Sequence, residues 1–525
     1  MTTDGTSSTP ESPRPSPAAF NPDDDYPDPR DDRQRADDQP NAAAQSAALT
    51  DSGGNPHEYP NDMIEGIREA RLDMARFQLP DPPIQFDVLR APRPRDPDQP
   101  DMGIVILVTR GELLLRVPTG GPAGPDEDAG AGGPAGPDED ASARGAEGGY
   151  ENHRPAWQQA DRLLSELGYK QVADHSRMGL PLRVYMAEDR GPERLVEDRD
   201  RIRAETGAEV DLNYVVTLGH VVKADDYPRE TAARRCYSPE WIRCHRVTRE
   251  ITVAVIDTGI NHENRTDGWL TGIPQGAANV DPLDVFPVRM ENGQVIPGDG
   301  VLDLSAGHGS FVAGTVEQVA PAATIRVYRA VDTEGMGKCD DIAIALVQAA
   351  RDGADIINLS LGTMTVDNLP PLAFTTAVDT VHNERPDVLV VASAGNTGQE
   401  LPMFPAAMKG VVGVGALKAD LTPVDWSNHG FWLDCSAVGV GITSTFVEGR
   451  ERYTDSKGEV VIEDFDPNSW ALWSGTSFSA PQIAGGVAQL CQLHDVTPPV
   501  ALSQLLDGRP FRPGYGIVIR ILPGT

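Results

Sequence analysis

The chain has 525 residues, 52 of them Gly and 45 Pro, and a formal net charge of −34. This length exceeds one ordinary domain, and the Gly and Pro content predicts long loops or linkers. The negative charge argues against binding to nucleic acid or to an anionic membrane, because both need a basic protein surface.

Two further features bear on the compartment. Five cysteines at irregular spacing predict reduced thiols and no disulfide framework. Residues 1–50 lack the apolar core of a signal peptide, and no run of about twenty apolar residues predicts a membrane span. We therefore expect a cytoplasmic protein, with export by a route that needs no signal peptide as the alternative.

The N-terminal part is expected to hold little fixed structure. Residues 1–60 form an acidic, Pro-rich stretch that cannot bury enough apolar surface to fold, which predicts a disordered tail. Residues 61–102 are expected to form a helix, over 61–77, and a linker.

Residues 103–222 predict a small α+β domain of the ferredoxin-like type. The expected order is β-α-β-β-α-β, the split βαβ pattern. Its elements are a strand or hairpin at 104–117, helices at 155–167 and 192–206, and strands at 169–174, 181–187 and 210–218. A Gly follows each helix directly, as is typical of helix C-termini.

An insert at 118–152 interrupts this pattern. It contains the sequence Gly-Gly-Pro-Ala-Gly-Pro-Asp-Glu-Asp-Ala twice, at 120–129 and at 132–141. Repeated Gly, Pro and acidic residues cannot form a core, so the insert is predicted to be a flexible surface loop.

The second half of the chain has a different character. After a mixed-charge linker at 223–249, short apolar runs alternate with helical segments through the domain at 250–525. This alternation predicts a doubly wound α/β fold, with a mostly parallel sheet covered on both faces. Polar, turn-rich segments at 281–304 and 447–469 are predicted to be surface insertions.

Three short motifs in this domain carry the residues of nucleophilic acyl transfer. Asp257 lies in Val-Ile-Asp-Thr-Gly, His308 in Gly-His-Gly-Ser-Phe-Val-Ala-Gly, and Ser477 in Ser-Gly-Thr-Ser-Phe-Ser-Ala-Pro. A serine hydroxyl attacks a carbonyl once a histidine removes its proton. A buried carboxylate then orients the imidazole and stabilises its cation.

A fourth motif, Ala-Ser-Ala-Gly-Asn, ends at Asn396. Its amide can donate a hydrogen bond to the oxyanion that forms in acyl transfer. Taken singly, these residues could be an Asp ending a strand, a His starting a helix, a helix-capping Ser and a turn Asn. Four coincidences in this order favour the chemical interpretation.

The four motifs resemble those of the subtilisin-like serine peptidases (peptidase S8), and the resemblance covers about 250–493. It implies a catalytic triad of Asp257, His308 and Ser477, with Asn396 in the oxyanion hole. Ser310 stands where the family usually has Thr and keeps the hydroxyl. The sedolisins lack this His motif and use Asp at the oxyanion hole, so the chain departs from their pattern.

The resemblance also implies a path for a peptide substrate. The segment Ser360, Leu361 and Gly362 matches the edge that pairs with the substrate as an added strand. Four residues would line the pocket for the side chain before the scissile bond: Ala392, Ser393, Ala394 and Gly395. These small residues predict an apolar or neutral preference there.

The family comparison further implies a mode of control and a missing cofactor. The run from Val312 to Thr324 leaves no room for the calcium loop of the secreted subtilisins, so we expect no such calcium site and no cofactor. Many of these enzymes carry a ferredoxin-like propeptide, whose role 103–222 would fill as an intramolecular inhibitor, with self-cleavage near 219–245. The expected partners are thus protein or peptide substrates. The alternatives are a non-catalytic binding protein of this fold, or an enzyme kept latent by its N-terminal domain.

Overall fold

The computed structural model describes residues 84–91, 104–118, 154–218, 228–231, 249–286, 289–291, 294–296, 298–454 and 460–524, together with Arg68. Every described residue belongs to the unit 55–525. The tail predicted at 1–60, nearly all of the insert predicted at 118–152 and all of the helix predicted at 61–77 except Arg68 lie outside the described residues.

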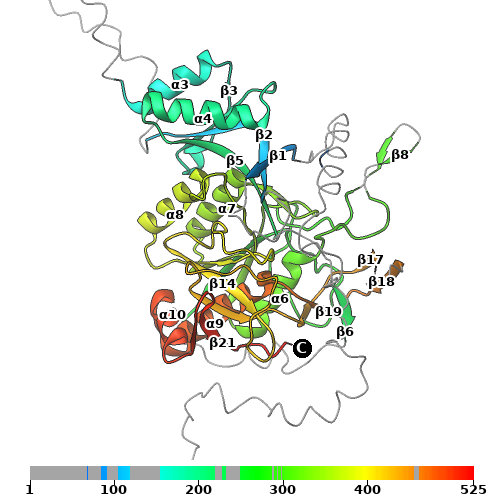
Figure 1. Ribbon diagram of the computed structural model, residues 1–525. Helices are drawn as coiled ribbons and strands as arrows, with labels where there is room; N and C mark the ends of the chain where they lie inside the picture. Colours follow the sequence, from blue (N-terminus) through cyan, green and yellow to red (C-terminus); the bar gives the residue numbers. More distant parts are fainter. Residues whose placement is uncertain are drawn as a thin grey trace, which may run out of the picture. The chain divides into compact units, whose positions relative to one another are not determined.

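A mostly parallel sheet forms the centre of the peptidase-like domain (Figure 1). Its order is β10-β7-β12-β13-β14-β15-β21-β20, and only β20 runs antiparallel to its neighbour. The bounds are β7 Thr252–Asp257, β10 Thr324–Arg329, β12 Ile356–Leu359, β13 Leu389–Ser393, β14 Val411–Leu417, β15 Cys435–Val438, β20 Phe511–Arg512 and β21 Gly516–Ile519. The predicted doubly wound α/β fold is confirmed.

Helices cover both faces of this sheet, as its continuous apolar strands require. On one face, α6 (His308–Val319) packs on α9 (Thr476–His494), and α10 (Pro498–Leu506) extends that layer. On the other face, α7 (Cys339–Arg351) packs on α8 (Leu372–Glu384). Along β7, Val253 and Val255 belong to the α6–α9 core, whereas Ala254 and Ile256 belong to the α7–α8 core.

The N-terminal domain has the predicted β-α-β-β-α-β order. It comprises β2 (Ile104–Arg116), α3 (Ala156–Glu166), β3 (Lys170–Asp174), β4 (Leu182–Met186), α4 (Pro192–Thr206) and β5 (Val210–Thr217). The strand order is β5-β2-β4-β3, and all neighbours are antiparallel, as in a split βαβ fold. Gly207 ends α4 in the left-handed conformation, with φ at 68°.

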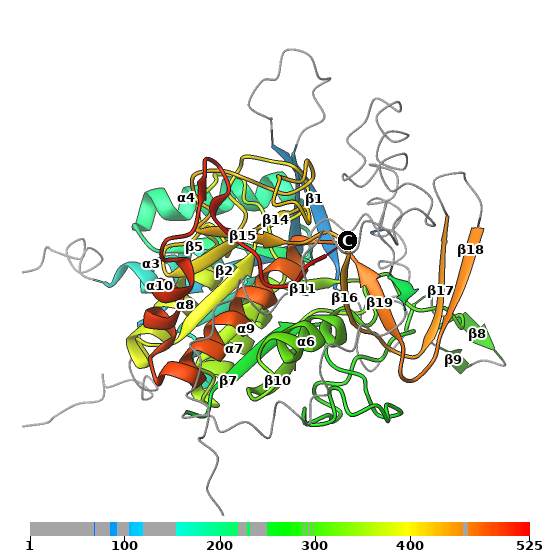
Figure 2. The same ribbon diagram turned by 90° about the horizontal axis from the view of Figure 1, so that it is seen from below.

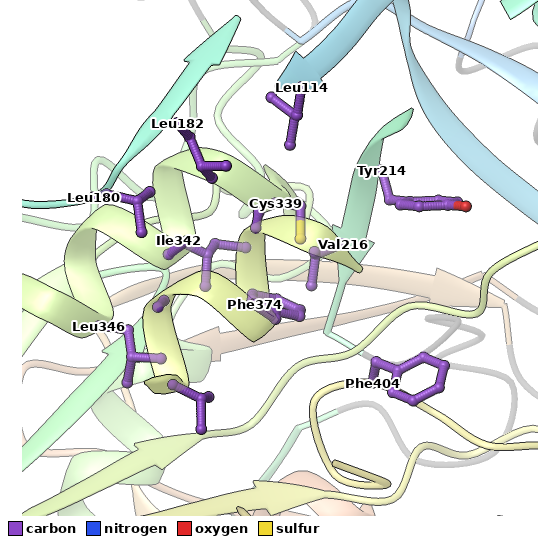
Figure 3. Packing of buried hydrophobic residues seen from close by; sticks show 14 of the residues in the cluster. Leu114, Leu180, Leu182, Tyr214, Val216, Cys339, Ile342, Leu346, Phe374 and Phe404 are labelled. Carbon is purple, nitrogen blue, oxygen red and sulfur yellow. The ribbon is translucent and has the colours of Figure 1, made fainter. Parts of the chain in front are cut away.

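The sheet of this domain lies on α7 and α8, with α3 and α4 on its other side (Figure 1). Figure 3 shows the shared apolar core, in which Val216 lies beside Cys339 and Phe374. Tyr214 and Ile342 belong to the same core. Strand β11 (Met336–Lys338), just before α7, pairs antiparallel with β5 and joins the two domains through backbone hydrogen bonds.

Buried polar contacts accompany the apolar ones at this interface. Asn213 Nδ2 donates to Glu112 Oε2 at 2.7 Å and to Asp340 Oδ1 at 2.8 Å, and Asp340 Oδ2 lies 2.8 Å from His175 Nε2. Asp211 Oδ2 accepts the Leu372 N–H at 3.1 Å, at the start of α8. Both helices therefore meet the N-terminal domain at their N-terminal ends.

Two predictions about linkers need correction. Residues 61–102 were expected to be helix and linker, but Phe86–Ala91 forms strand β1, which pairs with β2. Within the linker expected at 223–249, Arg229–Thr231 forms β6, which pairs with β19 (Trp470–Trp473). Strand β6 has three residues and its partner β19 lies more than 200 positions away, so local pattern did not reveal it. Strand β1 lies next to β2 in the sequence, but its short run was read as part of a linker.

The two segments predicted as surface insertions contain hairpins. Strands β8 (Arg289–Glu291) and β9 (Gln294–Ile296) lie in the first, and β17 (Gly449–Thr454) and β18 (Val460–Phe465) in the second. Figure 2 shows β17 and β18 beside β19, which also pairs with β16 (Ile442–Thr445). Within the described residues, no helix is both long and apolar enough to cross a bilayer.

Candidate active site

Asp257 and His308 meet at the carboxyl end of the central sheet. Asp257 is the last residue of β7, His308 is the first residue of α6, and His308 Nδ1 lies 2.7 Å from Asp257 Oδ1. Both side chains are buried. Since a carboxylate only accepts hydrogen bonds, Nδ1 carries the proton, which leaves Nε2 as the proton acceptor.

Asp281 holds the two motifs together from behind. Its Oδ2 accepts from Thr258 Oγ1 at 2.7 Å and from the Gly307 N–H at 2.9 Å, and its Oδ1 accepts from the Leu283 N–H. Thr258 Oγ1 in turn accepts the Gly309 N–H at 3.1 Å. These bonds join the residue after Asp257 to both neighbours of His308, and burial raises the pKa of Asp281 to about 6.

The sequence did not single out Asp281. It is the first of several Asp residues in the polar segment 281–304, and no motif distinguishes it from the others. The parallel bridge between Ile260 and Val280 places Asp281 next to the turn that follows Asp257.

Ser477 lies in the first turn of α9, next in sequence to Phe478, whose ring contacts the His308 ring. The ring of the next residue, Phe478, lies 5.3 Å from the imidazole, and the Trp473 ring lies 5.5 Å from it. Ser477 Oγ donates to the Ser360 carbonyl at 3.3 Å, while Ser360 Oγ donates to the Ser477 carbonyl at 2.8 Å. The Ser477 hydroxyl proton is thus directed at the Ser360 carbonyl, and the hydroxyl must rotate before it can donate to His308. Catalytic hydrogen bonds are often poorly aligned before substrate binds.

Asn396 lies against the start of the same helix. Its Oδ1 accepts from Thr476 N at 2.9 Å and from Thr476 Oγ1 at 2.8 Å. A methyl group added to Gly475 would lie 3.6 Å from Asn396 Nδ2. With its oxygen fixed by Thr476, the amide presents Nδ2 as a donor near the first turn of α9, which contains the Ser477 N–H.

The segment that contains Ser360, Leu361 and Gly362 follows β12 and is already paired with another strand. Thr217 and Gly362 exchange two backbone hydrogen bonds, of 3.0 and 2.8 Å. On the other side of the same strand, the Leu218 N–H donates to the Gly335 carbonyl at 3.1 Å. The end of β5 therefore lies between two edges of the peptidase-like domain.

The segment from Ala392 to Gly395 runs from the end of β13 to Asn396 and is buried. Asn428 fixes its outer end, because its Nδ2 donates to the Ala394 carbonyl and its backbone N–H to the Gly395 carbonyl, each at 2.9 Å. Sequence reasoning did not identify Asn428, which lies 32 positions beyond Asn396 in a segment without a motif.

Over the described residues, no three His, Cys, Asp or Glu side chains come together in a way that could hold a metal ion. Helix α6 runs without interruption to Val319, and β10 begins at Thr324. The prediction that the calcium loop is missing stays a prediction.

A doubly wound sheet with a hydrogen-bonded Asp–His pair and a serine at a helix start defines a domain of the subtilisin-like class. Residues 248–507, just under half of the chain, match the model of Peptidase_S8, the subtilase family, so this part of the chain is similar to the subtilases.

Curated relatives agree with this assignment. The chain is 32% identical over 244 residues to a thermophilic serine proteinase of Bacillus sp. strain AK1, covering 45% of this chain and 51% of the relative. It is 29% identical over 206 residues to subtilisin BL of Lederbergia lenta, covering 38% of this chain and 67% of the relative. The match thus spans about half the length of the first relative.

Among solved structures, fervidolysin from Fervidobacterium pennivorans, a keratinolytic enzyme related to subtilisin, aligns with 18% identity and a TM-score of 0.47. That alignment covers 84% of this chain and 63% of the fervidolysin chain.

Proposed function

We propose that the protein is a serine endopeptidase that uses Asp257, His308 and Ser477 as its triad. The observation that carries the proposal is the 2.7 Å contact between His308 Nδ1 and Asp257 Oδ1, beside the helix turn that bears Ser477. The match of residues 248–507 to the subtilase family model supports the same reaction.

In this reaction His308 Nε2 takes the proton of Ser477 Oγ as the oxygen attacks the peptide carbonyl. Asp257 keeps the imidazole in the correct tautomer and stabilises its cation. Asn396 Nδ2 and the Ser477 N–H donate to the oxyanion. His308 then protonates the leaving amine, and water activated by the same ring hydrolyses the acyl-enzyme.

A fluorophosphonate probe tests this proposal, because it reacts only with an activated serine. We expect the wild-type chain to be labelled and Ser477→Ala to remain unlabelled. Ser503→Ala, which removes an exposed hydroxyl from α10, is the matched control and should label like wild type. Equal labelling of wild type and Ser477→Ala would refute the assignment of Ser477. Absence of labelling in both wild type and Thr217→Pro, the variant with weakened inhibition that is described below, would favour the alternative of a non-catalytic binding protein.

We further propose that the N-terminal domain inhibits this site in the same chain. The paired strand at Thr217 and Leu218 supports this, since it lies on the edges at Gly362 and Gly335 that an extended substrate would use. Gly362 lies two positions after Ser360, so counting two positions after its partner Thr217 predicts self-cleavage after Gly219.

Two measurements test the inhibition. The intact mass of the purified chain should reveal fragments that end and begin at residues 219 and 220, and Ser477→Ala should abolish them. Thr217→Pro removes the N–H that bonds to Gly362, so this variant should react faster with fluorophosphonate than wild type does. If wild type and Thr217→Pro react at the same rate, the pairing does not restrain the site.

A further inference from the structure

Met403 lies between the two glycines that end the proposed substrate-binding segments. A methyl group added to Gly362 would lie 2.7 Å from Met403 Cγ and 3.0 Å from Sδ. A methyl group added to Gly395 would lie 2.8 Å from Met403 Cε. Since carbon atoms in ordinary contact are about 3.5–4.0 Å apart, the thioether side chain touches both backbones and fills the space between them.

The Met403 side chain is fixed in this place by its neighbours. Only 2% of the residue is exposed, and it belongs to the apolar core with Leu361 and Ala392. The next residue, Phe404, exchanges two backbone hydrogen bonds with Thr363, of 2.8 and 2.9 Å. Met403 is therefore anchored beside one segment, and its methyl end reaches the other.

We propose that Met403 closes the pocket for P1, the residue whose carbonyl Ser477 attacks, so that the enzyme cleaves after Gly and Ala. This inference rests on the proposed peptidase function and narrows it to a substrate class. A longer P1 side chain would have to displace a side chain packed in the core, and inserting extra carbon atoms into a filled site strains the structure. The small residues at 392–395 would alone have allowed a larger apolar side chain.

The chain's own sequence is consistent with this preference. Thr217 pairs with Gly362, which follows Ser360 by two positions, and the Ser360 carbonyl accepts the Ser477 hydroxyl. The self-cleavage position proposed above lies two positions after Thr217 in the sequence. Residue 219 is glycine. The predicted self-cleavage position thus bears no side chain for the pocket to receive.

The experiment compares peptides that differ only at P1, with Gly, Ala, Leu or Phe. Rates are measured with the full chain and with full-length Thr217→Pro, and they are divided by the concentration of fluorophosphonate-reactive sites. We expect kcat/KM for Ala to exceed that for Phe by roughly 10–200-fold, the range that differences of pocket size produce. Met403→Ala should raise the Phe-to-Ala ratio at least tenfold.

Met408→Ala is the matched control. It truncates another buried methionine of the same core, one that lies at neither glycine contact, and should leave the ratio unchanged. Met403→Leu provides a second variant that fills the pocket, and it should retain the preference for Ala if Met403→Ala fails to fold.

Equal hydrolysis of Phe and Ala peptides by wild type would overturn the proposal. So would an unchanged ratio in a folded Met403→Ala protein, as judged by its melting temperature. Failure of the peptidase function has a different signature, in which neither wild type nor Thr217→Pro is labelled or cleaves any peptide, and the specificity proposal then falls with it.

Discussion

Asp281 Oδ2 accepts the Thr258 hydroxyl at 2.7 Å, directly behind the Asp257–His308 pair. The same oxygen accepts the Gly307 N–H, so one carboxylate sets the distance between the end of β7 and the start of α6. Alignment of a base with its nucleophile depends on such distances, because a displacement of about 1 Å can reduce a rate by about 100-fold.

Asp281→Asn is therefore expected to lower kcat about tenfold or more with little change in KM. The amide NH2 of Asn would face the Leu283 N–H. Because both groups are donors, they would repel each other and displace the contacts to Thr258 and Gly307. The rate of fluorophosphonate labelling measures the effect, and melting temperature reports folding. Asp299→Asn, an exposed acid in the same segment, is the control. A variant that is fully active would mean that Asp281 only maintains the local fold.

Burial raises the pKa of Asp303 to about 7, from 3.8. A folded-state pKa above the unfolded one means that the folded protein binds the proton more tightly. This stabilisation is complete below the unfolded pKa and is lost as pH rises through about 7. Asp303 accepts hydrogen bonds from the Val285 N–H at 2.8 Å and from Thr333 Oγ1 at 2.5 Å.

Urea unfolding of Asp303→Asn, in a Ser477→Ala background to prevent self-digestion, tests this expectation. The amide cannot ionise, so the variant does not lose stability as Asp303 would. The unfolding free energy of Asp303→Asn minus that of its parent should therefore rise by on the order of 2 kcal/mol between pH 5 and pH 8. Asp387→Asn, at an exposed position, should show no such trend. A free-energy difference between Asp303→Asn and its parent that stays constant with pH would contradict the shift.

Asn396→Asp tests the donor role of the Asn396 amide while it preserves the acceptor role. The carboxylate keeps the acceptor for Thr476, so α9 should remain in place, but the Nδ2 donor is lost. We expect kcat to fall by roughly 10²–10³-fold, the usual effect of losing one oxyanion donor. Steady-state kinetics with one peptide measures this. Asn396→Ala, which also loses the contact to Thr476, should melt at a lower temperature than Asn396→Asp. If Asn396→Asp keeps wild-type kcat, Asn396 is not an oxyanion donor.

Asn213→Ala is expected to loosen the contact between the two domains. Its amide is the shared donor for Glu112 and Asp340, and its loss leaves two buried carboxylates facing each other. An unpaired buried polar group costs roughly 1–3 kcal/mol, so labelling of the full-length variant should be faster than that of wild type by about tenfold or more. Gln171→Ala, at an exposed position of β3, is the control. Unchanged labelling would assign the restraint to the apolar contacts alone.

Local sequence pattern predicted the elements that form from neighbouring residues. The alternation of apolar runs and helices predicted the doubly wound sheet, and the Gly after each N-terminal helix marked its end. The motifs also indicated Asp257 and His308, which the fold brings into hydrogen-bond contact. In each case the signal is contained within a short stretch of chain.

Features that depend on distant pairing were missed. Strands β1 and β6 have only six and three residues, and their partners β2 and β19 determine that they are strands. Met403 has no motif around it, and its importance comes from two glycines located 41 and 8 positions earlier in the sequence. Such relations require the register between strands, which composition and periodicity do not contain.

Strand β6 also limits how far the chain could move away from the site after self-cleavage. A break after Gly219 would create a new amino terminus only nine residues before Arg229, which is paired with Leu472 on β19. Fully extended, that tether reaches about 30 Å at most. The new amino terminus would stay within that reach of β19, whose Trp473 ring lies 5.5 Å from the His308 ring, and it could compete with incoming polypeptides until β6 separates from β19.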